Sequence, residues 1–439
     1  MTGLVLLGAA ALPAAAAEPT HVSASAPEVT AASRVIELTP GVGALQAAVD
    51  QAMPGDVLQL HSGTYTGQVF LRTSGTADAP IVIEPFGDGP VTVTATFQSA
   101  DCAASQPNGH RTLVLREGVD YWTIRGLRII NGIWVSGTNF AAPAGWIKTQ
   151  AKSLKDWKTR RALPGRGYVD GQTAVADPAS APQIYSALSD VLGLRIDPAT
   201  GVRIVGNDIS GRGVHVAVGE RGAIVGNTIH DISCGIGPGI WLNTYSDFWQ
   251  VTDNAISRVA SSTYRHYMQE GIRTGSASSY NTITGNTVSD LPGDGRGITT
   301  DIDASFNRFE HNTVTGAAMG FNDQQSGWGN IWRYNLTSDM RGSSMAFRGA
   351  DASLTVPSYN SSTLRAVVEC NVARGTGSRL TAGALISSTF VNNSYQRVGL
   401  SKNLKTYWTD YNNLWDGSSA LPPGSPPPPP VGSCPSPGA

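Results

Sequence analysis

The chain has 439 residues, of which 50 are glycines and 15% are charged. This length is large for one compact core but ordinary for a solenoid that grows by adding coils. The formal net charge of −2 argues against nucleic acid as a partner, because nucleic-acid-binding surfaces are usually basic. No stretch of about 20 apolar residues follows the N-terminal segment, so we expect no membrane span.

Residues 1–17 are typical of a secretory signal peptide. An apolar run begins at Leu4, and Ala14 to Ala17 offer small residues for cleavage before Glu18. We therefore expect a secreted, extracellular protein. Residues 18–34, rich in Ala, Ser, Thr and Pro, are predicted to be disordered.

Four widely spaced cysteines fit an oxidising compartment and not a zinc site: Cys102, Cys234, Cys370 and Cys434. One disulfide among the first three is compatible with this spacing. Cys434 lies in the Pro-rich tail of residues 421–439, which resembles a linker, and there we expect it to have no folded partner.

The folded part is expected to begin with a strand at 35–38. Residues 43–52 follow, in which Leu45, Ala48, Val49 and Ala52 recur at helical spacing. A short amphipathic helix at this place would cover the open end of a solenoid, where apolar side chains and strand edges are otherwise exposed.

Residues 52–85, AMPGDVLQLHSGTYTGQVFLRTSGTADAPIVIEP, alternate turns and strands. The segment resembles the opening coils of pectate-lyase-like β-helix proteins, a group that includes polysaccharide lyases and glycoside hydrolases. The resemblance implies an all-β fold, a right-handed parallel β-helix over residues 35–420, and a polysaccharide substrate. It does not choose among reactions, because one fold serves many chemistries. A long insertion with some helix is expected at 140–190, where it would wall a cleft or cover one face.

An asparagine repeat is the strongest signal in the chain. An Asn flanked by hydrophobic residues recurs at intervals of 20 to 36 residues, at positions 207, 227, 254, 286, 312, 335, 371 and 393. We expect the flanking hydrophobic residues to point inward. Each Asn is predicted to adopt the left-handed bend between two strands and to hydrogen-bond the Asn of the next coil. These asparagines are therefore interpreted as structural.

A second repeated element, Gly followed by a hydrophobic residue, lies 14 or 15 residues before an Asn of the repeat. Aligning five such elements predicts that the residue after the hydrophobic one points outward. The predicted exposed row is His215, Trp241, Arg273, Thr299 and Asn322, with Asn243, Asp301 and Gln324 beside it and Arg212, Glu270 and Arg296 before the glycines. We interpret this face as a groove for a sugar chain; an ordinary polar outer face is the alternative.

The predicted site is drawn from this face and from nearby ionisable residues. The candidate catalytic residues are Glu270, Arg273, Asp301, Asp303 and Asp323. The candidate substrate-binding residues are His215, Trp241, Asn243, His266, Tyr267, Arg296, Asn322 and Arg348. Asp301 and Asp303 lie on the same side of an extended segment, an arrangement suited to Ca²⁺ as a cofactor or to a shared proton.

Three functions remain open from the sequence. A lyase acting on uronic acids needs a cation that neutralises the substrate carboxylate and a base; relatives use Arg or Lys as the base, and this chain has no Lys between Lys158 and Lys402. We favour an Arg-based or His/Tyr-based lyase. A glycoside hydrolase would use paired carboxylates, although no Gly-His-Gly follows in the expected coils. The third candidate, a non-catalytic carbohydrate-binding solenoid, would rely on aromatic residues such as Trp249 and Trp332.

Overall fold

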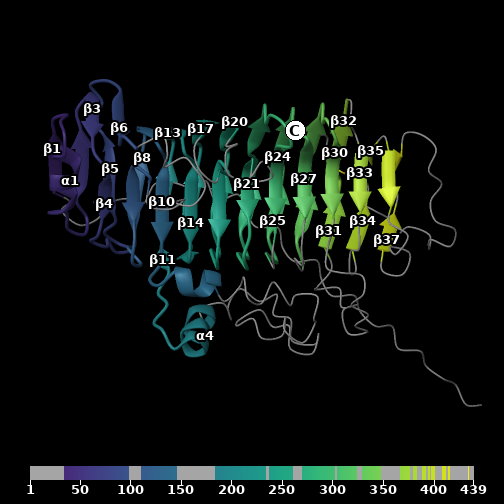
Figure 1. Ribbon diagram of the computed structural model, residues 1–439, viewed down its shortest axis with the longest axis horizontal. Helices are drawn as coiled ribbons and strands as arrows, with labels where there is room; N and C mark the ends of the chain where they lie inside the picture. Colours follow the sequence, from purple (N-terminus) through teal and green to yellow (C-terminus); the bar gives the residue numbers. More distant parts are fainter. Residues whose placement is uncertain are drawn as a thin grey trace, which may run out of the picture.

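The computed structural model is a solenoid of stacked coils, with the N-terminal coils at one end and the C-terminal coils at the other (Figure 1). Its longest sheets are all parallel, and neighbouring strands in a sheet come from successive coils. The structure describes residues 34–97, 110–145, 183–233, 237–260, 269–301, 304–323, 329–347, 366–375, 379–382, 388–391, 394–395, 397–400, 408–411, 414–415 and 434.

Three sheets run the length of the described part. Sheet A contains β1 (Val35–Leu38), β2 (Val57–Leu60), β5 (Ile81–Pro85), β8 (Trp122–Arg125), β12 (Arg203–Val205), β16 (Ala223–Val225), β19 (Gln250–Thr252), β22 (Thr282–Thr284), β25 (Arg308–Glu310), β28 (Ile331–Arg333), β31 (Ala366–Glu369), β34 (Ser388–Val391) and β37 (Trp408–Tyr411). Sheet B contains β3 (Gly63–Thr66), β6 (Val91–Thr94), β9 (Arg128–Ile130), β13 (Asp208–Gly211), β17 (Thr228–Ile232), β20 (Ala255–Val259), β23 (Thr287–Ser289), β26 (Thr313–Thr315), β29 (Leu336–Ser338), β32 (Val372–Arg374), β35 (Ser394–Tyr395) and β38 (Leu414–Trp415).

Sheet C, on which the predicted site lies, contains β4 (Val69–Leu71), β7 (Leu113–Leu115), β10 (Ile133–Ser136), β14 (Val214–Ala217), β18 (Ile240–Asn243), β21 (Glu270–Thr274), β24 (Arg296–Thr300), β27 (Met319–Asp323), β30 (Ser343–Phe347), β33 (Arg379–Ala382) and β36 (Arg397–Leu400). A short ribbon pairs β11 (Ala199–Thr200) with β15 (Gly219–Glu220). The predicted all-β parallel β-helix is confirmed, and its right hand follows the usual chirality of parallel crossovers.

The core consists of columns of like residues, one residue per coil. In sheet A one inward column is fully buried and runs through Ile204, Ile224, Val251, Ile283, Phe309 and Trp332. Burying such columns against each other supplies the main favourable term in folding. Trp249 and Trp332, which the binding-module interpretation would need on the surface, are fully buried in this core.

The asparagine ladder is confirmed from Asn207 to Asn371. In each step the Oδ1 of one Asn accepts hydrogen bonds from the backbone N–H and the Nδ2 of the Asn one coil earlier, as between Asn286 and Asn254 at 3.0 and 2.9 Å. The predicted left-handed bend, however, belongs to the residue before each Asn, such as Gly206 with φ 62°. The asparagine side chain forms the hydrogen bonds of the ladder, and the residue before it adopts the left-handed conformation that turns the chain.

A second ladder was missed in the sequence. Asn281, Asn307 and Asn330 form the same contacts at another corner of the coils, with 2.9 Å between the Nδ2 of Asn281 and the Oδ1 of Asn307. These asparagines precede the sheet A strands β22, β25 and β28, and all three are fully buried. Asn281 and Asn307 follow Tyr280 and Phe306 instead of the glycine that marks several steps of the first ladder, and of the three only Asn330 follows a glycine, so the repeat was not recognised.

Two helices cover parts of the solenoid. α1 (Ala44–Val49) lies at the N-terminal end (Figure 1) and buries Leu45 and Val49, which confirms the predicted end cap. α4 (Gln183–Leu192) packs Ile184, Tyr185 and Leu188 beside the coils, and the Tyr185 hydroxyl donates to the carbonyls of Gly219 and Tyr245. The rest of the predicted insertion, residues 146–182, lies outside the described part.

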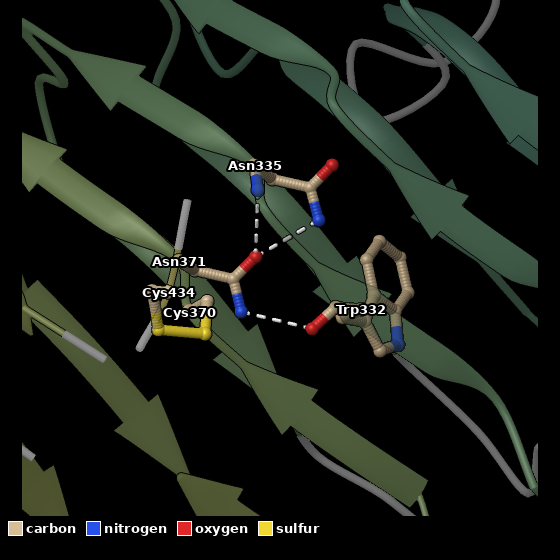
Figure 2. The surroundings of a disulfide bond; sticks show 5 residues. All are labelled: Trp332, Asn335, Cys370, Asn371 and Cys434. Carbon is tan, nitrogen blue, oxygen red and sulfur yellow. Dashed lines mark hydrogen bonds between the residues drawn. A yellow bond between two sulfur atoms is a disulfide. The ribbon is translucent and has the colours of Figure 1, made fainter. Parts of the chain in front are cut away.

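Cys434 has a folded partner, contrary to the prediction for the tail. It forms a disulfide with Cys370, whose φ of 54° marks the corner before Asn371. Figure 2 shows the disulfide beside the step of the ladder in which Asn371 accepts two hydrogen bonds from Asn335 and donates one to the Trp332 carbonyl. The sequence could not show this pairing, because 64 residues separate the two cysteines. Cys102 and Cys234 lie outside the described residues.

No helix in the described part of the chain is both long and apolar enough to cross a membrane. Residues 1–33, which include the predicted signal peptide and most of the segment predicted to be disordered, lie outside that part, as do the neighbours of Cys434 in the tail. Arg34, the last residue of that predicted segment, is described and pairs with Asp56.

Candidate functional site

Glycines set the spacing between the coils that carry the site. A Cβ added to Gly297 would lie 2.5 Å from the carbonyl oxygen of Gly320 in the next coil and 2.5 Å from a methyl of Val314. Only glycine therefore allows the coils to approach so closely at this position. The repeated Gly–hydrophobic element thus lies at or near the start of the sheet C strands β10, β14, β18, β21, β24 and β27.

The predicted register of the outward row is confirmed. In sheet C, His215 pairs with Trp241, Trp241 with Arg273, Arg273 with Thr299 and Thr299 with Asn322. The predicted exposure is wrong for most of the row: His215 and Asn322 are at most 2% exposed, Arg273 is 7% exposed and Thr299 is fully buried. Trp241 is half-buried. Strand alternation fixes which way a side chain points, but not what covers it.

Aromatic residues occupy the N-terminal half of the row. The rings of His215 and Trp241 stack at 4.2 Å and 10°, and Trp134 meets His215 edge-on at 4.4 Å. Asn243 lies 3.3 Å from the Nε2 of His215. Burial, together with the charge of Arg111, lowers the pKa of His215 well below its usual range, so this imidazole is neutral at pH 7.

Ion pairs occupy the next two coils. The Nη1 of Arg273 donates to both oxygens of Glu270 at 2.9 and 2.7 Å, and its Nη2 donates to Asp301. The Nη1 of Arg296 lies 3.6 Å from Glu270. We name these four residues, Glu270, Arg273, Arg296 and Asp301, the arginine–carboxylate cluster; their side chains are at most 14% exposed.

Arg273 is held as a cation in this arrangement. Burial alone would lower its pKa, but the charges of Glu270 and Asp301 and the hydrogen bonds to them outweigh burial and raise it above its ordinary value. A guanidinium bound on both sides to carboxylates cannot accept a proton. Arg273 therefore cannot act as the base of the predicted site, and its hydrogen bonds hold Glu270 and Asp301 in place.

Asp323 does not lie on the outward face. It pairs with Thr300, which pairs with Thr274 and then with the core residue Leu242, so its column points inward. There it contacts the Nδ2 of Asn330 in the second asparagine ladder at 3.4 Å. Burial raises the pKa of Asp323 to about 7, and the nearby charge of Asp301 adds to the shift. The sequence placed Asp323 with the outward residues because it overlooked the alternation after Phe321.

Several buried polar atoms along the row lack partners. They belong to outward-facing side chains in five successive strands, and among the described residues no group hydrogen-bonds the following atoms: Nδ1 of His215, Nε1 of Trp241, Nε of Arg273 and Arg296, Oγ1 of Thr299 and Oδ1 of Asn322. Buried polar groups are nearly always paired in native proteins. A line of such atoms therefore points to a polar ligand or to water molecules along sheet C.

The predicted calcium site has one carboxylate in the described part, Asp301, and it binds Arg273. Within the described ranges no three His, Cys, Asp or Glu side chains are placed to hold a metal ion. Calcium stays a prediction. His266, Tyr267, Asp303 and Arg348, together with Gln324, lie outside the described residues.

Trp134 extends the site beyond what the sequence indicated. It pairs with His215 and follows Gly132-Ile133, the same Gly–hydrophobic element. The next ladder asparagine, Asn207, follows Gly132 by 75 residues, so the 14- or 15-residue spacing did not reach Trp134. The guanidinium of Arg111 lies 5.9 Å from its ring centre.

The comparisons with known proteins agree with this architecture. No protein-family model matches the chain. Pectate lyase PEL9 of Emericella nidulans is 34% identical over 93 residues, which are 20% of this chain and 23% of that protein. Among solved structures, the periplasmic alginate epimerase AlgG has a TM-score of 0.50 at 12% identity, with 87% of this chain and 85% of that chain covered. The fold is that of the pectate-lyase-like parallel β-helices.

A second solved structure, pectate lyase Pel9A, has a TM-score of 0.43 at 12% identity, with 89% of this chain and 82% of that chain covered. The chain spans less than a quarter of the PEL9 sequence that it matches. The likeness to AlgG shows the fold alone, and the reaction has to be argued from the residues on sheet C.

Proposed function

We propose that this chain is a secreted lyase that cleaves uronic-acid-containing polysaccharides by β-elimination along sheet C. The observation that carries the proposal is the arginine–carboxylate cluster, which lies in register with the stacked rings of His215 and Trp241. Both belong to a row in which several buried polar atoms have no partner among the described residues. The partial match to PEL9, a pectate lyase, supports the same class of reaction.

The row provides both kinds of contact that a sugar chain needs. Sugar rings present C–H faces to aromatic rings and hydroxyls to polar groups. Half-buried Trp241, stacked on His215, offers an aromatic face, and the outward-pointing but buried Thr299 and Asn322 hold polar atoms without partners on the following coils. Strands in a sheet lie about 4.8 Å apart, so successive coils can contact successive parts of one polysaccharide.

The cluster supplies charge for the reaction. In β-elimination a base removes the proton at C5, a C4–C5 double bond forms and the C4–O4 bond breaks. The electrons of that bond leave with the oxygen, which takes up a proton from water. Removing the C5 proton requires neutralisation of the adjacent carboxylate. Arg296 is the cation suited to turn toward the substrate, because its contact with Glu270 is long at 3.6 Å. Arg273 is a positioning residue that keeps Glu270 and Asp301 paired.

A glycoside hydrolase remains the second candidate, because two carboxylates, Glu270 and Asp301, flank Arg273. Hydrolysis requires one carboxylic acid that donates a proton and one carboxylate that acts as base or nucleophile. Both carboxylates here accept hydrogen bonds from a guanidinium, an arrangement that holds charge and does not favour proton release. This geometry favours the lyase.

The two candidates give different products. The purified chain should be incubated with polygalacturonate, alginate and neutral galactan, and both ultraviolet absorbance and reducing ends should be followed. A lyase yields unsaturated uronate, which absorbs, together with new reducing ends, from an acidic polymer only. Reducing ends without absorbance would identify a hydrolase, and binding without either product would overturn both enzymatic candidates.

A further inference from the structure

A hollow of about 340 Å³ lies on the outer face of sheet A, away from the site on sheet C. Its floor contains Ala223 and Gln250 on neighbouring strands, with Thr282 on the next. Arg203 precedes Ala223 in the same outward column. The small side chain of Ala223 between Arg203 and Gln250 leaves room, and the volume lies within the range of about 300–1,000 Å³ typical of small-molecule sites.

A stack of large side chains forms one wall of the hollow. Arg221 lies over Phe248 at 4.8 Å, and the rings of Phe248, Tyr280 and Phe306 stack in turn at 5.0 and 5.4 Å. Each of these residues turns a coil corner with φ between 54° and 60°. Such left-handed corners recur along the solenoid, with large side chains also at His311 and Tyr334. Several other corners of the solenoid carry glycine instead.

The hollow carries positive charge. Arg203 is half-buried, and among the described residues its side chain forms neither an ion pair nor a hydrogen bond. Arg221 binds Glu220 at 3.1 Å and also lines the hollow. An unpaired guanidinium that is partly removed from water favours an anionic ligand. By contrast, Arg308, further along the same outward column, is paired with Glu310 at 3.0 Å.

We propose that this hollow is a second, non-catalytic saccharide site that binds a uronate residue of an acidic polysaccharide. Arg203 binds the carboxylate, Gln250 and Thr282 bind hydroxyls, and the edges of Phe248 and Tyr280 contact the apolar face of the sugar ring. The choice of a uronate rests on the proposed function. The site would hold one part of a long polymer on sheet A while another part lies along sheet C, which raises the effective concentration of substrate.

Affinity electrophoresis of the full chain tests the site. Native gels containing polygalacturonate, alginate or neutral galactan are run with the unaltered chain and with Arg203→Gln and Arg308→Gln. We expect acidic polymers to retard the unaltered chain, and Arg203→Gln to weaken the dissociation constant by about tenfold, the loss expected for one charge-assisted contact. The matched control Arg308→Gln should stay within about twofold, because Arg308 lies on the same column but outside the hollow.

Three results would overturn the site. The first is equal retardation of Arg203→Gln and the unaltered chain, and the second is retardation by galactan equal to that by the acidic polymers. The third is full competition by inorganic phosphate, which would indicate a general anion site. Thermal unfolding shows whether each variant is folded, and Arg203 is exposed enough for Gln to replace it. Formation of unsaturated product from a short trigalacturonate is measured separately. If no product forms but Arg203→Gln still reduces retardation, the proposed reaction fails and the second site stands.

Discussion

At the scale of single residues, burial changes the chemistry that the sequence suggests. His215 and Asp323 are both enclosed on sheet C, one on its outer side and one on its inner side. Loss of water disfavours the charged form of each, so the pKa of His215 falls and the pKa of Asp323 rises to about 7. Both groups are therefore largely neutral near pH 6, which suits the interior of a solenoid.

Asp323 should make stability depend on pH. Its pKa is about 7 in the folded chain and about 4 in an unfolded one, so the folded state binds more protons between these values. Its contribution to stability is full below pH 4 and is lost as the pH rises through 7, with a slope of at most about 1.4 kcal/mol per pH unit.

Replacing Asp323 with Asn should remove this term, because the amide is neutral at every pH. We expect the melting temperature of Asp323→Asn to exceed that of the unaltered chain at pH 8 and the difference to shrink toward pH 5. The difference between the two chains, measured by calorimetry from pH 5 to 8, cancels the effects of other titrating groups. A difference that does not grow from pH 5 to pH 8 would contradict a pKa of about 7 for Asp323 in the folded chain.

For the residues of the site, the sequence could predict what the alternation of side chains along a strand decides, namely which side of sheet C each side chain faces. The Gly–hydrophobic element correctly aligned His215 with Asn322 across five strands, because coil spacing requires glycine at those positions. It could not predict that the row is buried, or that Arg273 contacts Glu270 and Asp301 together. Those contacts depend on side-chain conformations and on the residues of neighbouring coils, which cannot be read from one strand alone.

At the scale of elements, the asparagine ladders hold successive coils together. Each ladder Asn lies where a strand ends and its own backbone needs partners, and its side chain supplies them across and along the coils. Asn286 shows the full pattern: it accepts from the N–H and Nδ2 of Asn254 and donates to the carbonyl of Val251 at 2.8 Å. Its removal would leave these buried groups unpaired, which costs about 1–3 kcal/mol for each group.

Asn286→Ala should therefore destabilise the chain strongly, by about 3 kcal/mol or more. Denaturant unfolding followed by circular dichroism measures the change. Gln250→Ala, which removes an exposed amide from the same region of the solenoid, should change stability by less than about 0.5 kcal/mol. Equal effects of the two substitutions would mean that the ladder is not a main source of stability.

At the scale of the whole molecule, the disulfide between Cys370 and Cys434 ties the end of the chain to a coil of the solenoid (Figure 2). The composition of the tail indicated a free linker, since runs of proline bury nothing. The general architecture was predictable from the sequence because successive coils repeat the same features: apolar residues that point inward, residues that turn the corners, and asparagines of the ladder. The disulfide occurs once, so no repeated sequence pattern could indicate it.

Removing this disulfide should lower stability mainly through the unfolded state. Closing a loop of 64 residues is worth about 4 kcal/mol in the chain-entropy description. We expect the double variant Cys370→Ser with Cys434→Ser to melt at a lower temperature. A reducing agent should lower the melting temperature of the unaltered chain by more than that of this variant. Equal melting temperatures of the two chains without reductant would show that the bond does not form.

The arginine–carboxylate cluster is the centre of the proposed function, and the rate of unsaturated uronate formation from polygalacturonate and alginate tests it most directly. We expect the unaltered chain to form this product and Arg296→Gln, which alters the less tightly paired arginine, to form it at least about 100-fold more slowly. Arg333→Gln, a control on sheet A where Arg333 binds Glu310 at 2.7 Å, should keep the full rate. Absence of unsaturated product from the unaltered chain, or an unchanged rate in a folded Arg296→Gln, would contradict the assignment.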